Sequence, residues 1–339
     1  MPGPPWHPVR KVVEPSRSEK YVSEVQNYVD VHAHYFPNRY IDFLANAGVL
    51  PDPRQCAGLG AGAEEAEMAA RLSYMDKAGV QLQILSPSPM TPCADNPKVA
   101  AEAAKLINDM LADLTVRHPD RFRFVAALPL AHITETLAEM DRAAKLDNFV
   151  GFAMTTSTSG KVLTDPAFLP VWEELETRKA RLILHPAGVN ACSPLLSDAL
   201  IWPVGSPIED SVAVVQLIAN GYPSRFPNVT IVNAHFGGVL PMVVDRLDHQ
   251  LPHAVAGLAE SPSTAVARMY YDTVGQGSVA AMEAAVTALG ADRLLLGTDF
   301  PYQKDEVYVS AIDYVRSAKI PDDIKAGVLG ETARSLFDL

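Results

Sequence analysis

The chain has 339 residues, and its 28 basic and 40 acidic side chains give a formal net charge of -12 at pH 7. The basic residues form no block, so we expect neither nucleic acid nor an anionic membrane surface as a partner. With 48% hydrophobic residues the chain can bury a large core, and chains of this length can fold as one barrel of alternating strands and helices.

The N-terminal residues differ in composition from the rest of the chain. Residues 1–24 are rich in proline and lack an apolar core segment, so we expect a flexible arm rather than a signal peptide or an anchor. The remainder, 25–339, is predicted to be one domain. The three cysteines are far apart and include no Cys-x-x-Cys pair, which argues against a disulfide framework and indicates a reducing, cytoplasmic compartment.

Short apolar runs alternate with helical patterns along the chain. The first run predicts a strand at 27–34, followed by a short helical segment at 39–48 and a loop at 51–62 that contains Pro and Gly. The other predicted strands cover 80–86, 122–130, 149–154, 181–186, 229–235, 269–274 and 293–299. The other predicted helices cover 64–78, 96–118, 134–146, 166–179, 210–221, 239–251, 279–289, 306–317 and 322–337.

Eight strands separated by helices predict an α/β fold, because parallel neighbours need crossover connections. We expect a (β/α)8 TIM-type barrel with a loop and helix insertion after strand 1. An open, doubly wound sheet is the competing architecture. No Gly-x-Gly-x-x-Gly turn follows a strand, so the dinucleotide-binding version of that sheet lacks its phosphate cradle.

Histidines and an aspartate stand where several predicted strands end. His32 and His34 close the first strand, and side chains two apart on a strand point to one face, where they can share a cation. This pair alone is weak evidence. His185, His235 and Asp299 end strands five, six and eight, and the carboxyl ends of barrel strands meet at the active-site mouth. Imidazoles with one carboxylate suit zinc or a similar divalent ion.

Each of these residues also has a structural alternative. His185 and His235 could be buried neutral histidines bonded to the backbone, and Asp299 could cap a helix. Glu209 and Asp210 are predicted to cap a helix rather than to catalyse. A non-catalytic barrel with structural zinc is a further alternative, but such sites are usually closed by four protein ligands, often thiolates, and the cysteines lie away from the strand ends.

Several motifs together resemble the amidohydrolase-related metal enzymes. The resemblance is to the branch that includes aminocarboxymuconate-semialdehyde decarboxylase and 6-methylsalicylate-type decarboxylases, and it covers nearly all of the chain from Tyr28 onward. It rests on DVHAH at 30–34, MDKAGV at 75–80, RFRF at 121–124, HP at 185–186, AHFGG at 234–238 and GTDFP at 297–301. The family fold is the amidohydrolase-like barrel, which agrees with the alternation of strands and helices.

The resemblance implies a role for each candidate residue. The metal ligands would be His32, His34, His185 and Asp299. His235 would be the acid-base partner, with Asp299 as a second candidate for the proton transfer. Arg246 matches the place where the resembling decarboxylase sends an arginine into the neighbouring subunit's site, which implies a homodimer or a higher homo-oligomer. The segment 151–156 offers no lysine that could be carbamylated, so one divalent ion, zinc or else manganese, is expected rather than two.

The implied activity is non-oxidative decarboxylation of a small carboxylate. Segments 165–172 and 178–180 resemble the phenolic-acid branch and favour an aromatic, hydroxybenzoate-like substrate over a muconate-type one. The metal would chelate the carboxylate and a neighbouring oxygen while an acid protonates the ring carbon. The alternative is hydrolysis of a lactone, ester or amide by a water that the metal activates. The same ligands serve both reactions, so the ligand set leaves this choice open.

Overall fold

The computed structural model describes residues 26–49, 52–188 and 198–339, and the arm predicted for 1–24 lies outside them. The strands are β1 (Tyr28–His34), β2 (Val80–Ser86), β3 (Phe122–Ala127), β4 (Phe149–Thr155), β5 (Ser157–Thr158), β6 (Lys161–Val162), β7 (Arg181–His185), β8 (Thr230–Asn233), β9 (Tyr270–Asp272) and β10 (Leu294–Leu295). The helices are α1 (Asn38–Asn46), α2 (Glu65–Ala78), α3 (Pro97–Arg117), α4 (Ile133–Ala143), α5 (Leu169–Thr177), α6 (Ser206–Ala219), α7 (Tyr222–Arg225), α8 (Leu240–Ala254), α9 (Pro262–Val266), α10 (Val279–Leu289), α11 (Glu306–Ser317), α12 (Asp322–Ala326) and α13 (Thr332–Phe337).

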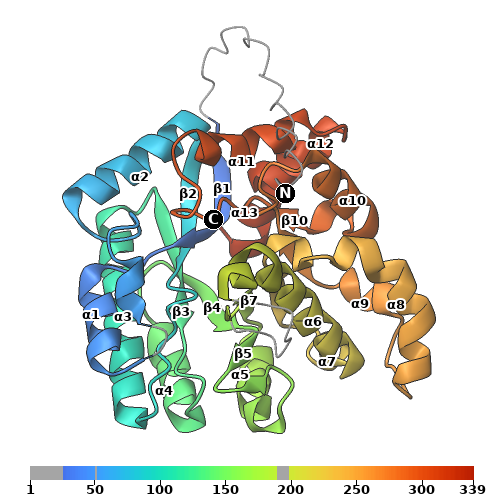
Figure 1. Cartoon of the computed structure of the whole chain (residues 1–339), viewed down its shortest axis with the longest axis horizontal. Helices are drawn as coiled ribbons and strands as arrows, with labels where there is room; N and C mark the ends of the chain where they lie inside the picture. Colours follow the sequence, from blue (N-terminus) through green and yellow to red (C-terminus); the bar gives the residue numbers. More distant parts are fainter. Residues whose placement is uncertain (1–25, 50–51, 189–197) are drawn as a thin grey trace, which may run out of the picture.

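Eight of the strands form one parallel sheet in the order β1-β2-β3-β4-β7-β8-β9-β10, surrounded by helices (Figure 1). The segment around β10 also bonds back to β1. The amide of Val31 donates to the carbonyl of Leu296 at 2.8 Å, and a parallel bridge joins Ala33 to Phe300. These contacts close the sheet into a barrel, so the predicted fold is confirmed. The insertion after strand 1 consists of α1, a 3-10 turn at Pro53–Cys56 and α2.

Local chemistry accounts for several element boundaries. The side chain of Asn96 accepts hydrogen bonds from the amides of Lys98 and Val99 and caps the start of α3. Helix α2 ends at Gly79, whose left-handed conformation (φ 75°) costs glycine little. Helix α6 begins at Ser206, four residues before the predicted start, because Pro207 is tolerated in a first helical turn.

Other boundaries differ from the sequence prediction. Two strands end earlier at the mouth than predicted. Strand β3 ends at Ala127, and β10 covers only Leu294–Leu295. The chain leaves the hydrogen-bonded ladder there to form the loops of the mouth. The predicted loop at 155–160 takes part in a short hairpin of β5 and β6. The predicted helix 322–337 is broken, because Gly330 has a non-helical backbone between α12 and α13.

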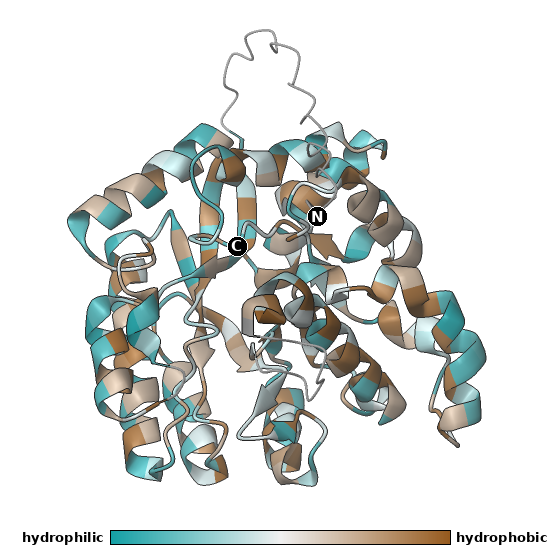
Figure 2. Cartoon of the chain, viewed as in Figure 1, coloured by the Kyte–Doolittle hydropathy of each residue, from teal (hydrophilic) through white to brown (hydrophobic). Residues whose placement is uncertain are grey.

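The core has two parts. A large apolar cluster lies between the outer face of the barrel and the helices, which carry hydrophilic residues outward (Figure 2). A second cluster fills the barrel itself with Val29, Val31, Leu82, Ile84, Val125, Ala153, Ile183, Val232 and Leu295. Ala333 and Phe337 of α13 pack against this second cluster. Helix α13 thereby closes the end of the barrel opposite the mouth, and the predicted site lies at the mouth.

Candidate metal centre

Four of the predicted site residues meet at the mouth of the barrel. They are His32 and His34 of β1, His185 at the end of β7 and Asp299 after β10. One ligand atom of each lies within 4.8 Å of the ligand atoms of the others. The three imidazole rings are 5.0 to 5.1 Å apart between centroids. Residues up to 267 positions apart in sequence thus form one compact donor set, of a composition that can hold a divalent cation.

An irregularity in β1 brings both histidines into the mouth. The pairing of β1 with β2 shifts register between Asp30 and Ala33. Val31 belongs to the cluster inside the barrel, whereas Ala33 belongs to the cluster between sheet and helices. Strict alternation would place those two residues on the same face. The shift therefore turns His32 and His34 inward and leaves Asp30 on the side of the helices.

His32 is oriented by an aspartate that the sequence analysis did not single out. Asp272, the last residue of β9, places Oδ2 2.6 Å from Nδ1 of His32. This contact leaves Nε2 of His32 buried, without a hydrogen-bond partner and 3.5 Å from Oδ1 of Asp299. A buried polar atom without a partner is unfavourable. A cation bound to Nε2 would satisfy it, in an arrangement of carboxylate, imidazole and metal that is common in metal sites.

The other donors are also in forms that suit a cation. Nδ1 of His185 lies 2.8 Å from the carbonyl oxygen of Pro186, which leaves Nε2 available. Burial, reinforced by the neighbouring histidines, holds the pKa of His185 well below its ordinary value, so its imidazole is neutral. Burial raises the pKa of Asp299, but a hydrogen bond from His34 and the charges of nearby imidazoles outweigh this effect, and the pKa lies below its ordinary value.

Asp299 occupies a constrained backbone position. Its φ of 61° lies in the left-handed region, which is uncommon for residues other than glycine. Its amide donates to the carbonyl of His32 at 2.8 Å, and Oδ1 lies 3.0 Å from Nε2 of His34. The backbone bond ties the loop after β10 to β1. Asp299 therefore belongs to the cluster through its backbone as well as through its carboxylate, and it does not serve as a helix cap.

His235 lies beside the four residues and outside their donor set. Its ring centroid is 5.3 Å from that of His32 and 6.1 Å from that of His185. Nδ1 lies 2.8 Å from Oδ2 of Asp210. Burial lowers the pKa of His235, but the charge and hydrogen bond of Asp210 dominate and raise it to about 9. His235 can therefore hold a proton on Nε2 at neutral pH.

The predicted helix-capping role of Glu209 and Asp210 is wrong. Helix α6 has Gly205 at its N-cap and no side-chain cap bond. Asp210 instead binds His235, and burial raises its pKa to about 6. Glu209 accepts hydrogen bonds from the amides of Ala187 and Gly188 at 2.7 and 3.2 Å and from the hydroxyl of Thr156. Both carboxylates thus fix residues around the mouth.

Asp272 could have been found from the sequence, whereas Asp210 could not. Asp272 lies two residues before the end of the predicted strand 269–274, and in the structure it is the last residue of β9, so the strand-end criterion extends to it. It also accepts a hydrogen bond from the amide of His235 at 2.9 Å, which links His32 to the loop after β8. Asp210 lies on a helix, and no strand-end pattern identifies it.

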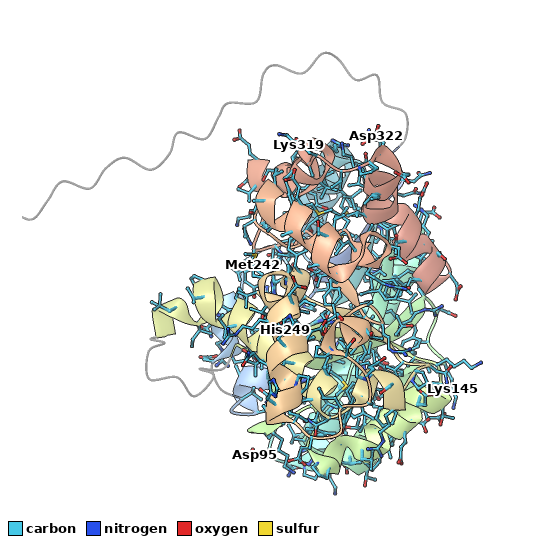
Figure 3. The ribbon with its side chains drawn as sticks, turned by 90° about the vertical axis from the view of Figure 1, so that its right-hand side faces the viewer. Asp95, Lys145, Met242, His249, Lys319 and Asp322 are labelled. Atoms are coloured by element: carbon cyan, nitrogen blue, oxygen red, sulfur yellow. The ribbon has the colours of Figure 1, made fainter. Side chains whose placement is uncertain are left out.

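Arg246 lies outside the cluster. It is exposed on α8, the helix on which Figure 3 labels Met242 and His249. Within the described residues, Arg246 takes part in none of the ion pairs. Met242, four residues earlier on the same helix face, is 78% exposed. The structure of one chain therefore leaves the predicted role of Arg246 untested.

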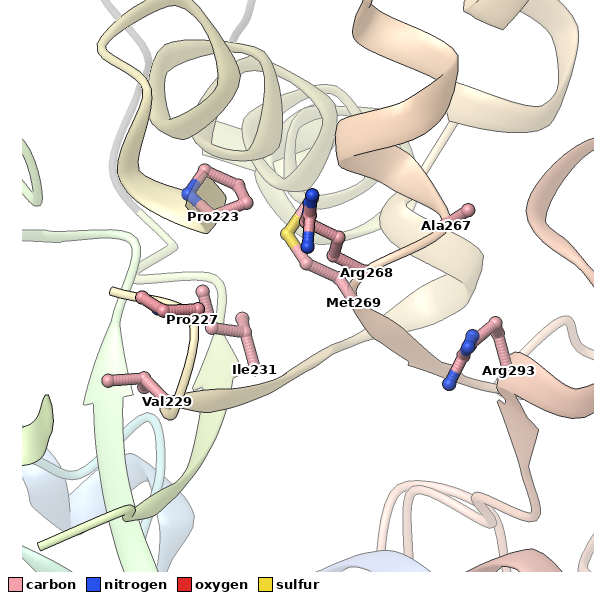
Figure 4. A pocket seen from close by; sticks show the side chains of 8 residues that line it. All are labelled: Pro223, Pro227, Val229, Ile231, Ala267, Arg268, Met269 and Arg293. Atoms are coloured by element: carbon pink, nitrogen blue, oxygen red, sulfur yellow. The ribbon is translucent and has the colours of Figure 1, made fainter. Parts of the chain in front are cut away.

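A hollow at the opposite end of the barrel has a different character. It has a volume of about 220 Å³ and is lined by Pro223, Pro227, Val229, Ile231, Ala267, Arg268, Met269 and Arg293 (Figure 4). Arg268 is paired with Glu260 at 2.7 Å, and Arg293 donates to the hydroxyl of Tyr270 at 2.8 Å. Its lining contains no histidine, cysteine or carboxylate. Among the residues that the structure describes, the group of candidate metal ligands lies at the mouth, where Nε2 of His32 and Nδ1 of His34 are buried without a partner.

Comparisons with known proteins agree with this geometry. The amidohydrolase family model matches residues 29–339. The chain is 32% identical to "Decarboxylase yanB" of Aspergillus niger over 332 residues, which cover 91% of this chain and 87% of that protein. It is 26% identical to 2-amino-3-carboxymuconate-6-semialdehyde decarboxylase of Dictyostelium discoideum, with coverage of 79% and 76%.

A solved structure shares the fold over most of its length. It is a dihydroxybenzoic acid decarboxylase from Polaromonas sp. JS666, determined with bound manganese and the inhibitor 2-nitroresorcinol. The TM-score is 0.76 at 23% identity, and the match covers 93% of this chain and 97% of that one. The family match, the barrel and the donor set at its mouth lead to one conclusion: the chain belongs to the amidohydrolase family.

Proposed function

We propose that this chain is a metal-dependent, non-oxidative decarboxylase, a carboxy-lyase of the amidohydrolase family. The observation that carries the proposal is the convergence of three imidazoles and one carboxylate within 4.8 Å at the mouth of the barrel, with His235 beside them. The proposed metal ligands are His32, His34, His185 and Asp299. The decarboxylase relatives at 26 to 32% identity over most of the chain support the reaction class.

We propose a single divalent ion. Strand β4 ends in Thr155 and is followed by Thr156, so no lysine is available there to bridge two metals. Nitrogen donors with one carboxylate suit zinc, whereas the Polaromonas decarboxylase was solved with manganese. When bound, the ion would supply Lewis acidity toward the substrate carboxylate and a neighbouring oxygen. Elemental analysis of freshly purified protein identifies the ion.

His235 is the proposed proton donor. Asp210 holds Nδ1 and favours the imidazolium, so Nε2 carries the proton that the reaction needs. That proton adds to the ring carbon that bears the carboxylate. The bond between that carbon and the carboxylate then breaks, its electron pair returns to the ring, and carbon dioxide leaves. Asp299 has a second carboxylate oxygen and is the other candidate for this transfer.

The proposed substrate is an aromatic, hydroxybenzoate-like acid, with a muconate-type acid as the second choice. The names of the relatives support both classes, and the inhibitor in the Polaromonas structure is a substituted resorcinol. The decisive assay compares carbon dioxide release from hydroxybenzoates and muconate semialdehydes with hydrolysis of lactones, esters and amides. We expect turnover only in the first panel. Turnover only in the second panel would assign the chain to the hydrolase alternative.

We further propose that the chain works as a homodimer in which Arg246 binds the substrate carboxylate of the neighbouring subunit. The support is the exposed face around α6 and α8, where large apolar side chains reach solvent: Trp202, Val204, Ile208, Val212, Val239 and Met242. Exposed apolar patches of this kind mark interaction sites. Light scattering on the purified protein measures the oligomeric state directly.

Two variants test the shared site. Arg246→Ala is expected to weaken substrate binding and to leave the metal content unchanged. Mixing it with Asp299→Ala should restore part of the activity, because each mixed dimer then contains one intact site. No recovery after subunit exchange would indicate a site built within one chain. Lys145→Ala, at an exposed lysine on the surface between α4 and β4, serves as the control for loss of a surface cation.

A cytoplasmic location is also proposed from the cysteines. Cys56 and Cys93 are free thiols, whereas Cys192 lies outside the described residues. Among the described helices, none is both long and apolar enough to cross a membrane.

A further inference from the structure

A buried arginine lies directly behind the first strand of the barrel. Arg71 belongs to α2, within the insertion between β1 and β2, and its side chain is fully buried. Its Nη2 donates to the carbonyl oxygen of His34 at 2.5 Å, and its Nη1 donates to Oε1 of Gln83 at 3.1 Å. The guanidinium carbon lies 4.5 Å from the centre of the Phe300 ring. One side chain thus contacts both segments that carry His34 and Asp299.

A carboxylate continues this contact network toward the other proposed ligand of β1. Nε2 of Gln83 donates to Oδ2 of Asp30 at 2.9 Å. Asp30 accepts hydrogen bonds from the hydroxyl and amide of Thr298 at 2.6 and 3.0 Å, and from the amide of His32 at 3.0 Å. The network therefore binds the backbone at His32, at His34 and directly before Asp299.

The buried charge of Arg71 reduces the stability of the fold. Within the described residues, no acidic side chain forms an ion pair with it, and its Nε has no hydrogen-bond partner. Burial lowers the pKa of Arg71 to about 10, so the group remains a cation at neutral pH. A buried cation without a direct counter-ion destabilises a fold, and apolar residues would fill the same volume more favourably. Stability alone therefore does not account for an arginine at this position.

We propose that Arg71 is a positioning residue that sets the metal affinity of the cluster. It fixes the backbone of His34 through the carbonyl and holds the Asp299 loop through Phe300, while Gln83 and Asp30 extend the same restraint to His32. This inference rests on the proposed metal centre. Groups that orient ligands in this way commonly change metal affinity by about 10- to 100-fold when they are removed.

The test measures metal affinity rather than activity. Metal-free protein is titrated with Co²⁺ in competition with a chelator, and the absorption spectrum of the bound Co²⁺ reports the ligand geometry. We expect Arg71→Met to bind Co²⁺ about 10- to 100-fold more weakly than the wild type and to show an altered spectrum. Arg71→Lys should lose less affinity, because the lysine ammonium keeps the charge and can still donate hydrogen bonds. It lacks the planar guanidinium that contacts two partners at once.

Arg121→Met is the matched control. Arg121, which directly precedes β3, also binds a backbone carbonyl of the same sheet, with its Nε 2.9 Å from the carbonyl oxygen of Gln81. This contact is at the N-terminal end of β2, away from the mouth. Its loss should lower the melting temperature of the metal-free protein and leave the Co²⁺ affinity and spectrum unchanged.

Each outcome is decisive. Wild-type Co²⁺ affinity in folded Arg71→Met, with only a lower melting temperature, would overturn the positioning role and reduce Arg71 to a structural residue. If Arg71→Met does not fold, Arg71→Lys decides in the same way, since unchanged affinity and spectrum would contradict the proposal. Failure of the wild-type protein to bind any divalent ion would instead overturn the proposed metal centre itself.

Discussion

The two ends of the barrel bury opposite kinds of side chain. At the mouth, the ligand atoms of three imidazoles and one carboxylate lie within 4.8 Å of one another. At the other end, Ala333 and Phe337 of α13 pack against an apolar interior, and the nearby arginines of the surface hollow are already bonded to neighbouring groups. The same eight strands run through both ends. The fold therefore concentrates unfavourable polar burial at one end and gains stability from apolar burial at the other.

The two ends of the barrel should respond differently to substitution. Buried polar groups without partners reduce stability, whereas buried apolar area increases it. Changes at the mouth should therefore affect metal and catalysis while the metal-free fold persists. Changes at the closed end should affect stability and leave the site intact.

The largest effect is expected for Asp299→Asn. The variant loses the anionic ligand, so metal affinity should fall by more than about 100-fold and decarboxylation should disappear. Elemental analysis after dialysis measures the retained metal. The control is Asp322→Asn, at a side chain that is 99% exposed. Full metal content in Asp299→Asn would contradict the separation of the two ends.

His235→Ala is expected to lower kcat by about 10²- to 10⁴-fold, because it removes the proposed proton donor. The metal content should remain that of the wild type, since His235 is outside the donor set. Steady-state carbon dioxide release measures the effect, and His249→Ala on the exposed face of α8 provides the comparison. Unchanged turnover would leave Asp299 as the donor.

Phe337→Ala tests the closed end. Phe337 is 2% exposed, and truncating a buried phenylalanine costs about 3 to 5 kcal/mol of unfolding free energy. Urea unfolding of the metal-free protein measures this loss, and Co²⁺ affinity of the folded variant should not change. Val116→Ala, at a side chain that is 54% exposed, should change stability by less than about 0.5 kcal/mol. Weaker metal binding by Phe337→Ala without a loss of stability would mean that the two ends are coupled.

The smallest change is expected for Asp210→Asn. Asp210 raises the pKa of His235 to about 9, and removing its negative charge withdraws the interaction that favours the imidazolium. The pKa of His235 should therefore fall toward its ordinary value of 6.5, measured by NMR titration of the metal-free protein. An unchanged pKa would show that Asp210 does not control the protonation of His235.

Much of the barrel could be predicted from the sequence because each strand and helix has its own local pattern. The strand at 80–86 and the helices at 279–289 and 306–317 begin and end where the apolar pattern predicts. The positions of His32, His34, His185 and Asp299 followed from one rule, that parallel strands of a barrel end at a common mouth. Local pattern and a single topological rule therefore placed these four residues and His235 at one mouth, and the resemblance to the family separated His235 from the ligands.

The supporting residues were decided only by tertiary structure. Asp272 meets His32 across 240 positions in sequence, and Asp210 reaches His235 from a helix rather than from a strand. The register shift in β1 that turns Asp30 away from the mouth depends on pairing with β2 and leaves no mark in an alternating pattern. In the sequence Arg71 is one of several charged residues of a predicted helix, and its contact with His34 exists only once α2 is packed against the sheet. Such contacts depend on how elements pack against each other, and local sequence periodicity carries no information about that packing.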